Sequence, residues 1–128
     1  MKEHSFANSF FHALNGIVYV FHNERNMKIH AVAALAAIGL GCVFHLGRVE
    51  WGMLFITIFF VLAAETINTA LEKTVDLITV EFQPLARLAK DMAAGAVLLS
   101  AINAIIMAFV IFGPHFLNLI PLGGLLSC

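Results

Sequence analysis

The sequence predicts an all-α integral membrane protein with an N-terminal amphipathic surface helix and three transmembrane helices. The first observation is composition: 61% of the 128 residues are hydrophobic and only 12% are charged, whereas soluble domains carry about 25% charged residues. The second is that three apolar stretches approach the roughly 20 residues that a helix needs to cross a bilayer. A chain of this length is expected to form one domain, residues 1–128.

The three predicted spans are residues 29–46, 51–71 and 92–112. The third contains no charged residue, and the second contains none before Glu65. The link between the first two spans is so short that it predicts a hairpin, whereas the link before the third span is long and charged. An apolar tail, residues 113–128, follows without an evident role.

Residues 5–22 form an amphipathic pattern instead of a span. At helical periodicity, large apolar side chains fall on one side and polar side chains on the other, which is typical of a helix lying in the membrane interface. A helix packed on a protein surface is the alternative. The apolar set is Phe6, Phe10, Leu14, Ile17 and Phe21, and the polar set is Asn8, His12, Asn15, Tyr19 and His22.

The distribution of basic residues predicts the orientation of the chain in the membrane. Lys and Arg occur before the first span and between the second and third spans, but only Arg48 lies in the first link and none follows Phe112. Cytoplasmic loops carry the excess of these residues. We therefore expect a cytoplasmic N-terminus and an external C-terminus. The net charge of −1 gives no basic footprint for nucleic acid.

Charged and polar side chains continue the second span in a regular stripe. Glu65, Asn68, Glu72 and Asp76 are spaced by three, four and four residues, which places them on one helix face. Ionisable groups in or near a bilayer are costly and commonly functional. We expect this stripe to meet other groups from the same membrane surface, namely Glu24, Lys90 and Asp91.

Such a cluster suits phosphoryl transfer. Carboxylates together with phosphate oxygens suit Mg²⁺, and a lysine near a helix N-terminus suits phosphate. The alternative is a set of solvated or paired side chains at a span end, which applies best to Asp76 and Glu81, while Asn68 could form an interhelical hydrogen bond. There is no Walker A or protein-kinase motif.

The remaining polar residue types have ordinary interpretations. The six histidines show no metal-ligand spacing and are interpreted as interfacial side chains. Cys42 and Cys128 are interpreted as small residues and not as a disulfide. The mixed charge of the first residues predicts no cleavable signal peptide.

Three blocks of the sequence resemble the prokaryotic diacylglycerol kinase family. "ETINTALEKTVD" (residues 65–76) fits the signature E-x-hydrophobic-N-[ST]-[SA]-aliphatic-E-x-x-[VL]-D at every specified position. "RLAKDMAAGAVLL" (residues 87–99) is similar to a second block, and "NERNMKIH" (residues 23–30) to the segment before the first span. The resemblance covers roughly residues 5–112.

The resemblance implies a homotrimeric membrane kinase, with active sites between protomers, that transfers the γ-phosphate of Mg-ATP to a lipid alcohol. It implies that Glu65 is the general base, that Asn68 orients the base or the phosphate, and that Asp76 is supporting. Ser5 and His12 fall at nucleotide-site positions but differ in residue type from the family. The implied Mg²⁺ ligands are Glu24 and Glu72, and the implied nucleotide-binding residues are Lys90, Asp91, Glu81, Phe82 and Gln83.

The lipid substrate is predicted from a finer resemblance. "ERNMKIH" (residues 24–30) is similar to the Gram-positive members, which mostly phosphorylate undecaprenol, so undecaprenol is expected and diacylglycerol is the alternative. Two other hypotheses remain. One is a non-enzymatic membrane protein, a relay or scaffold, in which the carboxylates carry protons or ions. The other is an inactive family member, which the intact motif disfavours.

Overall fold

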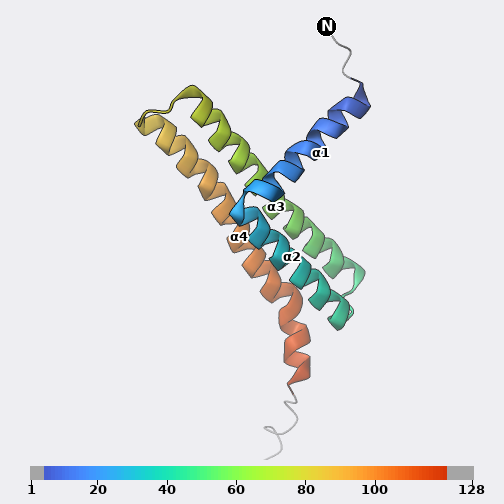
Figure 1. Ribbon diagram of the computed structural model, residues 1–128. Helices are drawn as coiled ribbons and strands as arrows, with labels where there is room; N and C mark the ends of the chain where they lie inside the picture. The colour runs from blue at the N-terminus through green and yellow to red at the C-terminus, as the bar shows by residue number, and fades with distance from the viewer. Residues whose placement is uncertain (1–4, 121–128) are drawn as a thin grey trace, which may run out of the picture.

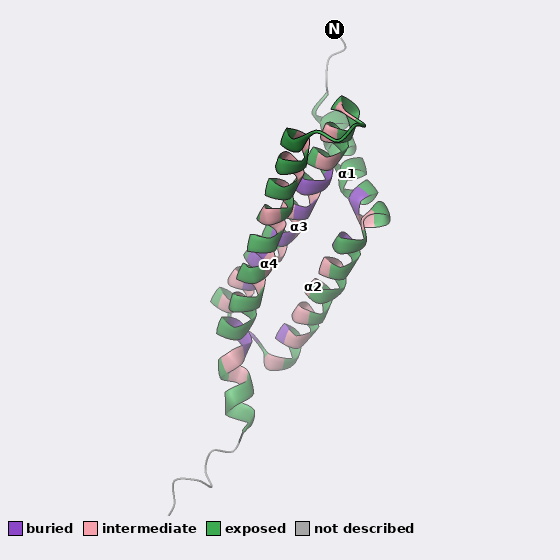
Figure 2. Ribbon diagram, turned by 90° about the vertical axis from the view of Figure 1, so that its left-hand side faces the viewer, coloured by how far each residue is buried: buried purple, intermediate pink, exposed green. Residues whose placement is uncertain are grey.

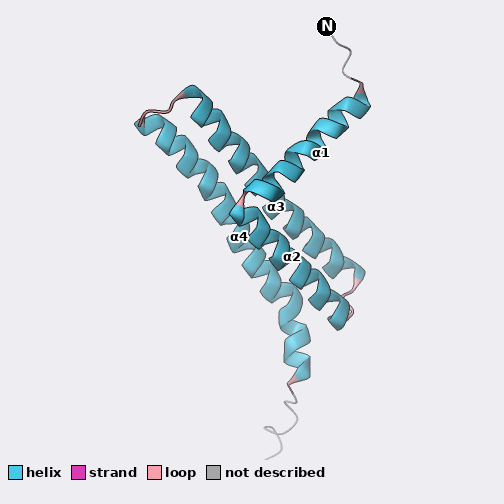
Figure 3. Ribbon diagram, viewed as in Figure 1, coloured by secondary structure: helices cyan, strands magenta, loops and turns pink. Residues whose placement is uncertain are grey.

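The computed structural model describes residues 5–120, and within them the chain is helical apart from short connections (Figures 1 and 3). Three of the four helices are long and apolar enough to cross a membrane. The elements are α1 (Phe6–Asn23), α2 (Arg25–Phe44), α3 (Arg48–Ile78) and α4 (Pro84–Leu119).

The three apolar stretches predicted as spans lie on α2, α3 and α4, although residues 45 and 46 of the first stretch belong to the turn after α2. α3 has 31 residues and α4 has 36, so each exceeds the roughly 20 residues of a span. The additional residues at the charged end belong to the link that was predicted between the second and third spans. Because α3 runs to Ile78 and α4 begins at Pro84, a residue type suited to a first helical turn, the connection contains only residues 79–83.

The surface helix predicted at residues 5–22 is confirmed as a helix. A single residue, Glu24, separates α1 from α2 and has an extended backbone, with φ −99° and ψ 122°. α1 contacts α2 and α3 near this break, and its N-terminal part leads away from the three long helices (Figure 1). Only Val20 of α1 is buried, so its apolar side chains face outward from the described chain.

A tight turn joins α2 to α3, as the short link predicted. His45 adopts a left-handed conformation (φ 55°), and the Leu46 amide donates to the Gly41 carbonyl at 3.1 Å, which closes the C-terminus of α2. A Cβ atom on Gly41 would lie 2.9 Å from side-chain atoms of Leu46 and of Trp51. Glycine at this position therefore allows the close approach of α2 to the start of α3.

The segment after residue 112 differs from the prediction of a separate tail. α4 continues to Leu119 and includes Pro114, whereas residues 121–128 of that tail lie outside the described chain. His115 and the Glu50 carboxylate lie 2.9 Å apart (Nε2 to Oε1), and the His115 ring stacks on Phe44 at 5.4 Å. These contacts hold the end of α4 against the α2–α3 turn.

The apolar core lies at the same end of the bundle. Four buried apolar side chains pack the α2–α3 turn against α3 and α4: Leu46, Leu54, Ile111 and Phe112. α3 and α4 run antiparallel and share the most extensive contact in the chain. Figure 2 shows further buried positions along α3, away from this core. Apart from Val61, those positions are polar, and they include Glu65, Asn68 and Thr69.

Candidate active site

The polar stripe of α3 passes from a buried to an exposed environment. Glu65 is 1% exposed and Asn68 is 7% exposed, whereas Glu72 is half-buried and Asp76 is exposed. The helical spacing therefore predicted a shared face correctly. How deeply Glu65 is buried depends on the helices packed around it.

The buried members of the stripe have unpaired polar atoms. Glu65 Oε2, Asn68 Oδ1 and Thr69 Oγ1 have no hydrogen-bond partner among the protein atoms of residues 5–120. Leaving such a group unpaired costs about 1–3 kcal/mol. The one side-chain hydrogen bond of Asn68 is long, 3.4 Å from Nδ2 to Glu72 Oε1. These three atoms therefore add no hydrogen bond to the stability of the described chain, and they remain available to a ligand or a further partner.

Carboxylates from two elements approach Glu65. Glu24, at the break between α1 and α2, and Glu72, two turns along α3, both lie close enough for their charges to act on Glu65. Within residues 5–120, no group of three or more His, Cys, Asp or Glu side chains is arranged to hold a metal ion. Mg²⁺ commonly takes only one or two carboxylates and completes its shell with water and phosphate oxygens. The oxygen donors of Glu24 and Glu72 fit that kind of site.

His30 also lies beside Glu65, a neighbour that its interpretation as an interfacial side chain did not include. Its Nε2 atom is 3.9 Å from Glu65 Oε2, and its side chain is 20% exposed. This separation exceeds a hydrogen bond. The pair therefore consists of two polar groups that face one another without a direct bond.

Lys90 and Asp91 occupy the exposed end of the site, on α4. Lys90 Nζ donates to Asp76 Oδ1 at 2.6 Å, which connects α4 to the stripe on α3. Asp91 accepts from Arg87 Nε at 3.2 Å within α4. Exposed ion pairs of this kind contribute about 0–1 kcal/mol to stability. A phosphate could therefore compete for Lys90 at little cost.

The predicted nucleotide segment Glu81–Gln83 lies in the α3–α4 connection. Together with Asp76, Arg87 and Lys90, its three residues line a hollow of about 460 Å³. Asp76 is eleven residues from Glu65, which corresponds to about 16 Å along the helix at 1.5 Å per residue. The structure thus brings Glu81, Phe82, Gln83 and Lys90 together, at a distance from the buried carboxylate.

The sequence reasoning missed two buried polar residues, and two residues that it named do not join the site. Thr69, next to Asn68, and Ser100 are 2% and 0% exposed, and the Ser100 hydroxyl donates to the Val97 carbonyl within α4. The only signal for Thr69 was its place in the signature block, and Ser100 had none. Ser5 and His12 are exposed at the N-terminal half of α1, which leads away from Glu65 (Figure 1).

Comparison with known proteins decides the family. The family model for prokaryotic diacylglycerol kinase matches residues 11–112. This chain belongs to the prokaryotic diacylglycerol kinase family. The resemblance predicted from the signature block is thereby confirmed, and this membership covers α2, α3 and most of α1 and α4.

The names of relatives of this diacylglycerol kinase family member give two lipid substrates, undecaprenol and diacylglycerol. The chain is 44% identical over 109 residues to undecaprenol kinase from Bacillus subtilis, covering 85% of this chain and 89% of the relative. It is 40% identical over 112 residues to a diacylglycerol kinase from Synechocystis, covering 87% and 64% of the two chains. It is 31% identical over 101 residues to diacylglycerol kinase from Escherichia coli, covering 79% and 83%.

Proposed function

We propose that this family member is an ATP-dependent lipid kinase that phosphorylates undecaprenol to undecaprenyl phosphate. The observation that carries the proposal is the buried carboxylate of Glu65, which has an unpaired oxygen inside a membrane helix. The hydroxyl of a membrane lipid can approach such a group from within the bilayer, while the phosphates of ATP approach from the exposed end of the stripe. Family membership supports the same chemistry and disfavours the relay and scaffold hypotheses.

Glu65 is proposed as the general base. It accepts the proton of the lipid hydroxyl while the hydroxyl oxygen bonds to the γ-phosphorus and the bond to ADP breaks. General-base catalysis typically contributes about 10²–10⁴-fold in rate. Asn68, one helical turn further along α3, is proposed to orient the base or the transferring phosphate with its buried amide.

The phosphates are proposed to lie between Glu65 and the exposed end of the stripe. Glu24 and Glu72 would hold Mg²⁺, which neutralises phosphate charge when it is bound. Lys90 would exchange its bond to Asp76 for a phosphate oxygen. Asp76 would then hold Lys90 in position between cycles.

The nucleotide is proposed to extend from those phosphates toward the α3–α4 connection. Glu81, Phe82 and Gln83 line the hollow in that connection, and Asp91 lies next to Lys90 on α4. Positioning two substrates against one another accounts for much of the rate in phosphoryl transfer. An arrangement with ATP along the exposed end and lipid at the buried end meets that requirement.

Diacylglycerol is the second candidate substrate, because relatives bearing that name are 31–40% identical to this chain. Undecaprenol is favoured by the 44% identity to the Bacillus subtilis enzyme and by the segment "ERNMKIH". Both lipids present a primary hydroxyl at the membrane surface, so the chemistry at Glu65 would be the same.

The protein is proposed to be a single-domain homotrimer in the bacterial cytoplasmic membrane, with active sites between protomers. The N-terminus and the active site would face the cytoplasm and the C-terminus would be outside. α1 would lie in the membrane interface, because Phe6 and Phe10 are 88% and 59% exposed in the described chain. Residues of neighbouring protomers would then complete the nucleotide site.

A competition assay tests the choice of lipid. Purified protein in mixed micelles receives Mg-ATP and equal amounts of undecaprenol and diacylglycerol, and both phosphorylated products are quantified. The proposal expects undecaprenyl phosphate to dominate. Dominant phosphatidic acid would assign the protein to diacylglycerol, and consumption of neither lipid by folded protein that binds ATP would contradict the kinase assignment.

A further inference from the structure

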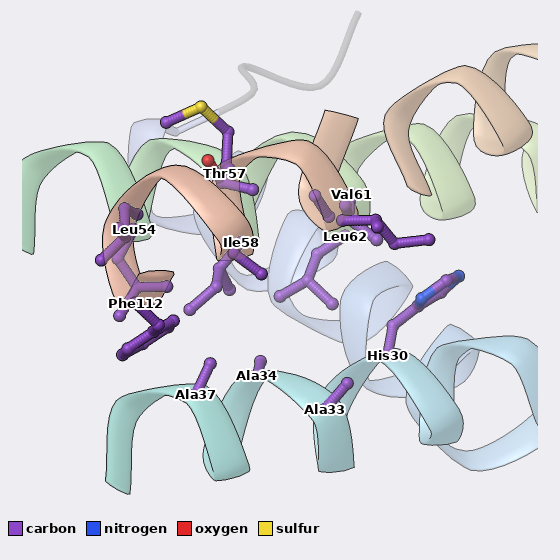
Figure 4. Close-up of a pocket in the computed structure, with 15 residues that line it drawn as sticks. His30, Ala33, Ala34, Ala37, Leu54, Thr57, Ile58, Val61, Leu62 and Phe112 are labelled. Carbon is purple, nitrogen blue, oxygen red and sulfur yellow. The ribbon is translucent and has the colours of Figure 1, made fainter. Parts of the chain in front are cut away.

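A cavity of about 240 Å³ lies between α2, α3 and α4, and it begins beside His30 (Figure 4). In the close-up, His30 lies at one end of the cavity and Phe112 at the other. The lining between them is apolar apart from Thr57. The Thr57 hydroxyl already donates to the Met53 carbonyl at 2.7 Å. The polar groups available to a ligand are therefore confined to the end at His30.

Small residues on α2 create this space. Ala33, Ala34 and Ala37 line the cavity opposite side chains of α3 and α4 (Figure 4). Larger side chains at these positions would fill the gap between the helices. The cavity is thus apolar and lies between the three helices that are long and apolar enough to cross a membrane, which suits a hydrocarbon chain and not a nucleotide.

We propose that His30 is a second group that binds the hydroxyl of the lipid substrate, and that the cavity receives the first part of the lipid chain. This inference rests on the proposed function. The occupant is an amphiphile with one polar end, because the cavity offers polar groups at one end only. That end adjoins the buried carboxylate that would take the hydroxyl proton.

The geometry of the two polar groups fits one hydroxyl. His30 Nε2 and Glu65 Oε2 are 3.9 Å apart, so an oxygen atom placed between them can lie about 2.8 Å from both. A neutral imidazole donates its Nε2 proton to the hydroxyl oxygen, and the hydroxyl donates its own proton to Glu65. During transfer the hydroxyl proton moves to Glu65 while the hydroxyl oxygen bonds to the γ-phosphorus and ADP leaves. His30 keeps its own proton.

The test separates lipid binding from nucleotide binding. His30→Phe keeps a ring of similar size and removes both nitrogens, whereas His30→Gln restores a hydrogen-bond donor. The expected result for His30→Phe is an increase of about tenfold in the KM for undecaprenol, with the KM for ATP unchanged, and partial recovery in His30→Gln. A structural defect would change both KM values, and that outcome would overturn the inference.

A second pair of variants tests the cavity without changing a polar group. Ala34→Leu places a larger side chain in the lining, and Ala36→Leu makes the same change at an exposed position of α2 outside the lining. Ala34→Leu is expected to raise the KM for undecaprenol several-fold and to leave the KM for ATP unchanged. Ala36→Leu is expected to change neither. Equal effects of the two substitutions would contradict a chain in the cavity.

The outcomes also distinguish this inference from the proposed function. If wild-type protein phosphorylates no lipid, the proposed function fails. If wild-type protein phosphorylates undecaprenol and the His30→Phe and Ala34→Leu variants retain its lipid KM, the kinase assignment stands and the inference is wrong. Thermal unfolding in the same micelles shows whether the His30→Phe variant is misfolded. If it is, the lipid KM values of the His30→Gln and Ala34→Leu variants test the inference.

Discussion

Replacement of Glu65 by Gln separates the catalytic role of this side chain from any structural role. The substitution keeps the size of the side chain and removes its ability to accept a proton. Loss of general-base catalysis predicts a fall in kcat of about 10²–10⁴-fold, which corresponds to about 2.7–5.4 kcal/mol at 1.36 kcal/mol per factor of ten. This fall should occur at saturating ATP and saturating lipid.

The same substitution should leave the stability of the fold nearly unchanged. Oε2 of Glu65 has no hydrogen-bond partner in residues 5–120, and the nearest cation-forming group, His30, is 3.9 Å away. Replacing the carboxylate therefore breaks no observed bond of that oxygen, and it removes the cost of burying a charge. The free energy of unfolding is expected to change by less than about 1 kcal/mol.

Measurement of kcat and of the thermal unfolding midpoint in the same micelles checks both expectations. Glu50→Gln is the matched control, because it makes the same change on the same helix at the α2–α3 turn, far from the stripe. That variant should retain its turnover. Near-normal turnover of the Glu65→Gln variant would refute the assignment of the base, and a large loss of its stability would indicate a structural role instead.

Three further predictions concern the metal, the nucleotide and the packing of the turn. Glu72→Gln should raise the Mg²⁺ concentration needed for half-maximal activity, and an unchanged Mg²⁺ titration would exclude it as a ligand. Lys90→Met should raise the KM for ATP about tenfold, as expected when a charged hydrogen bond to phosphate is lost, and should leave the lipid KM constant. Asp76→Asn should raise the KM for ATP less than Lys90→Met does. Gly41→Ala should destabilise the protein by about 1–3 kcal/mol through overpacking, since the new Cβ would lie 2.9 Å from neighbouring side chains. Gly39→Ala is the control, because a Cβ there meets nothing within 4 Å. Equal unfolding midpoints of the two variants would contradict this prediction.

The sequence was informative wherever local periodicity determines structure. Apolar runs predicted the three spans, because a bilayer requires a fixed helix length. The spacing of Glu65, Asn68, Glu72 and Asp76 predicted a shared face, because a helix repeats every 3.6 residues. Lys90 was expected near the stripe, because both were predicted at the same membrane surface, and its bond to Asp76 confirms that Lys90 lies beside the stripe.

Features that depend on packing between helices could not be predicted in this way. The position of His30 beside Glu65 depends on how α2 rests against α3, and no sequence spacing across a turn encodes it. The continuation of α4 beyond Pro114 was missed because proline usually ends a helix. Contacts of His115 with Glu50 and Phe44, 65 and 71 residues away, accompany that continuation.

The most direct test of the kinase assignment follows the phosphate itself. Purified protein in lipid–detergent micelles receives undecaprenol and ATP labelled either at the γ-phosphate or at the α-phosphate. We predict that label from the γ-position appears in undecaprenyl phosphate and that label from the α-position does not. Absence of γ-label from undecaprenol and from diacylglycerol, with folded protein that binds ATP, would contradict the assignment and leave the buried carboxylate of Glu65 without its proposed role.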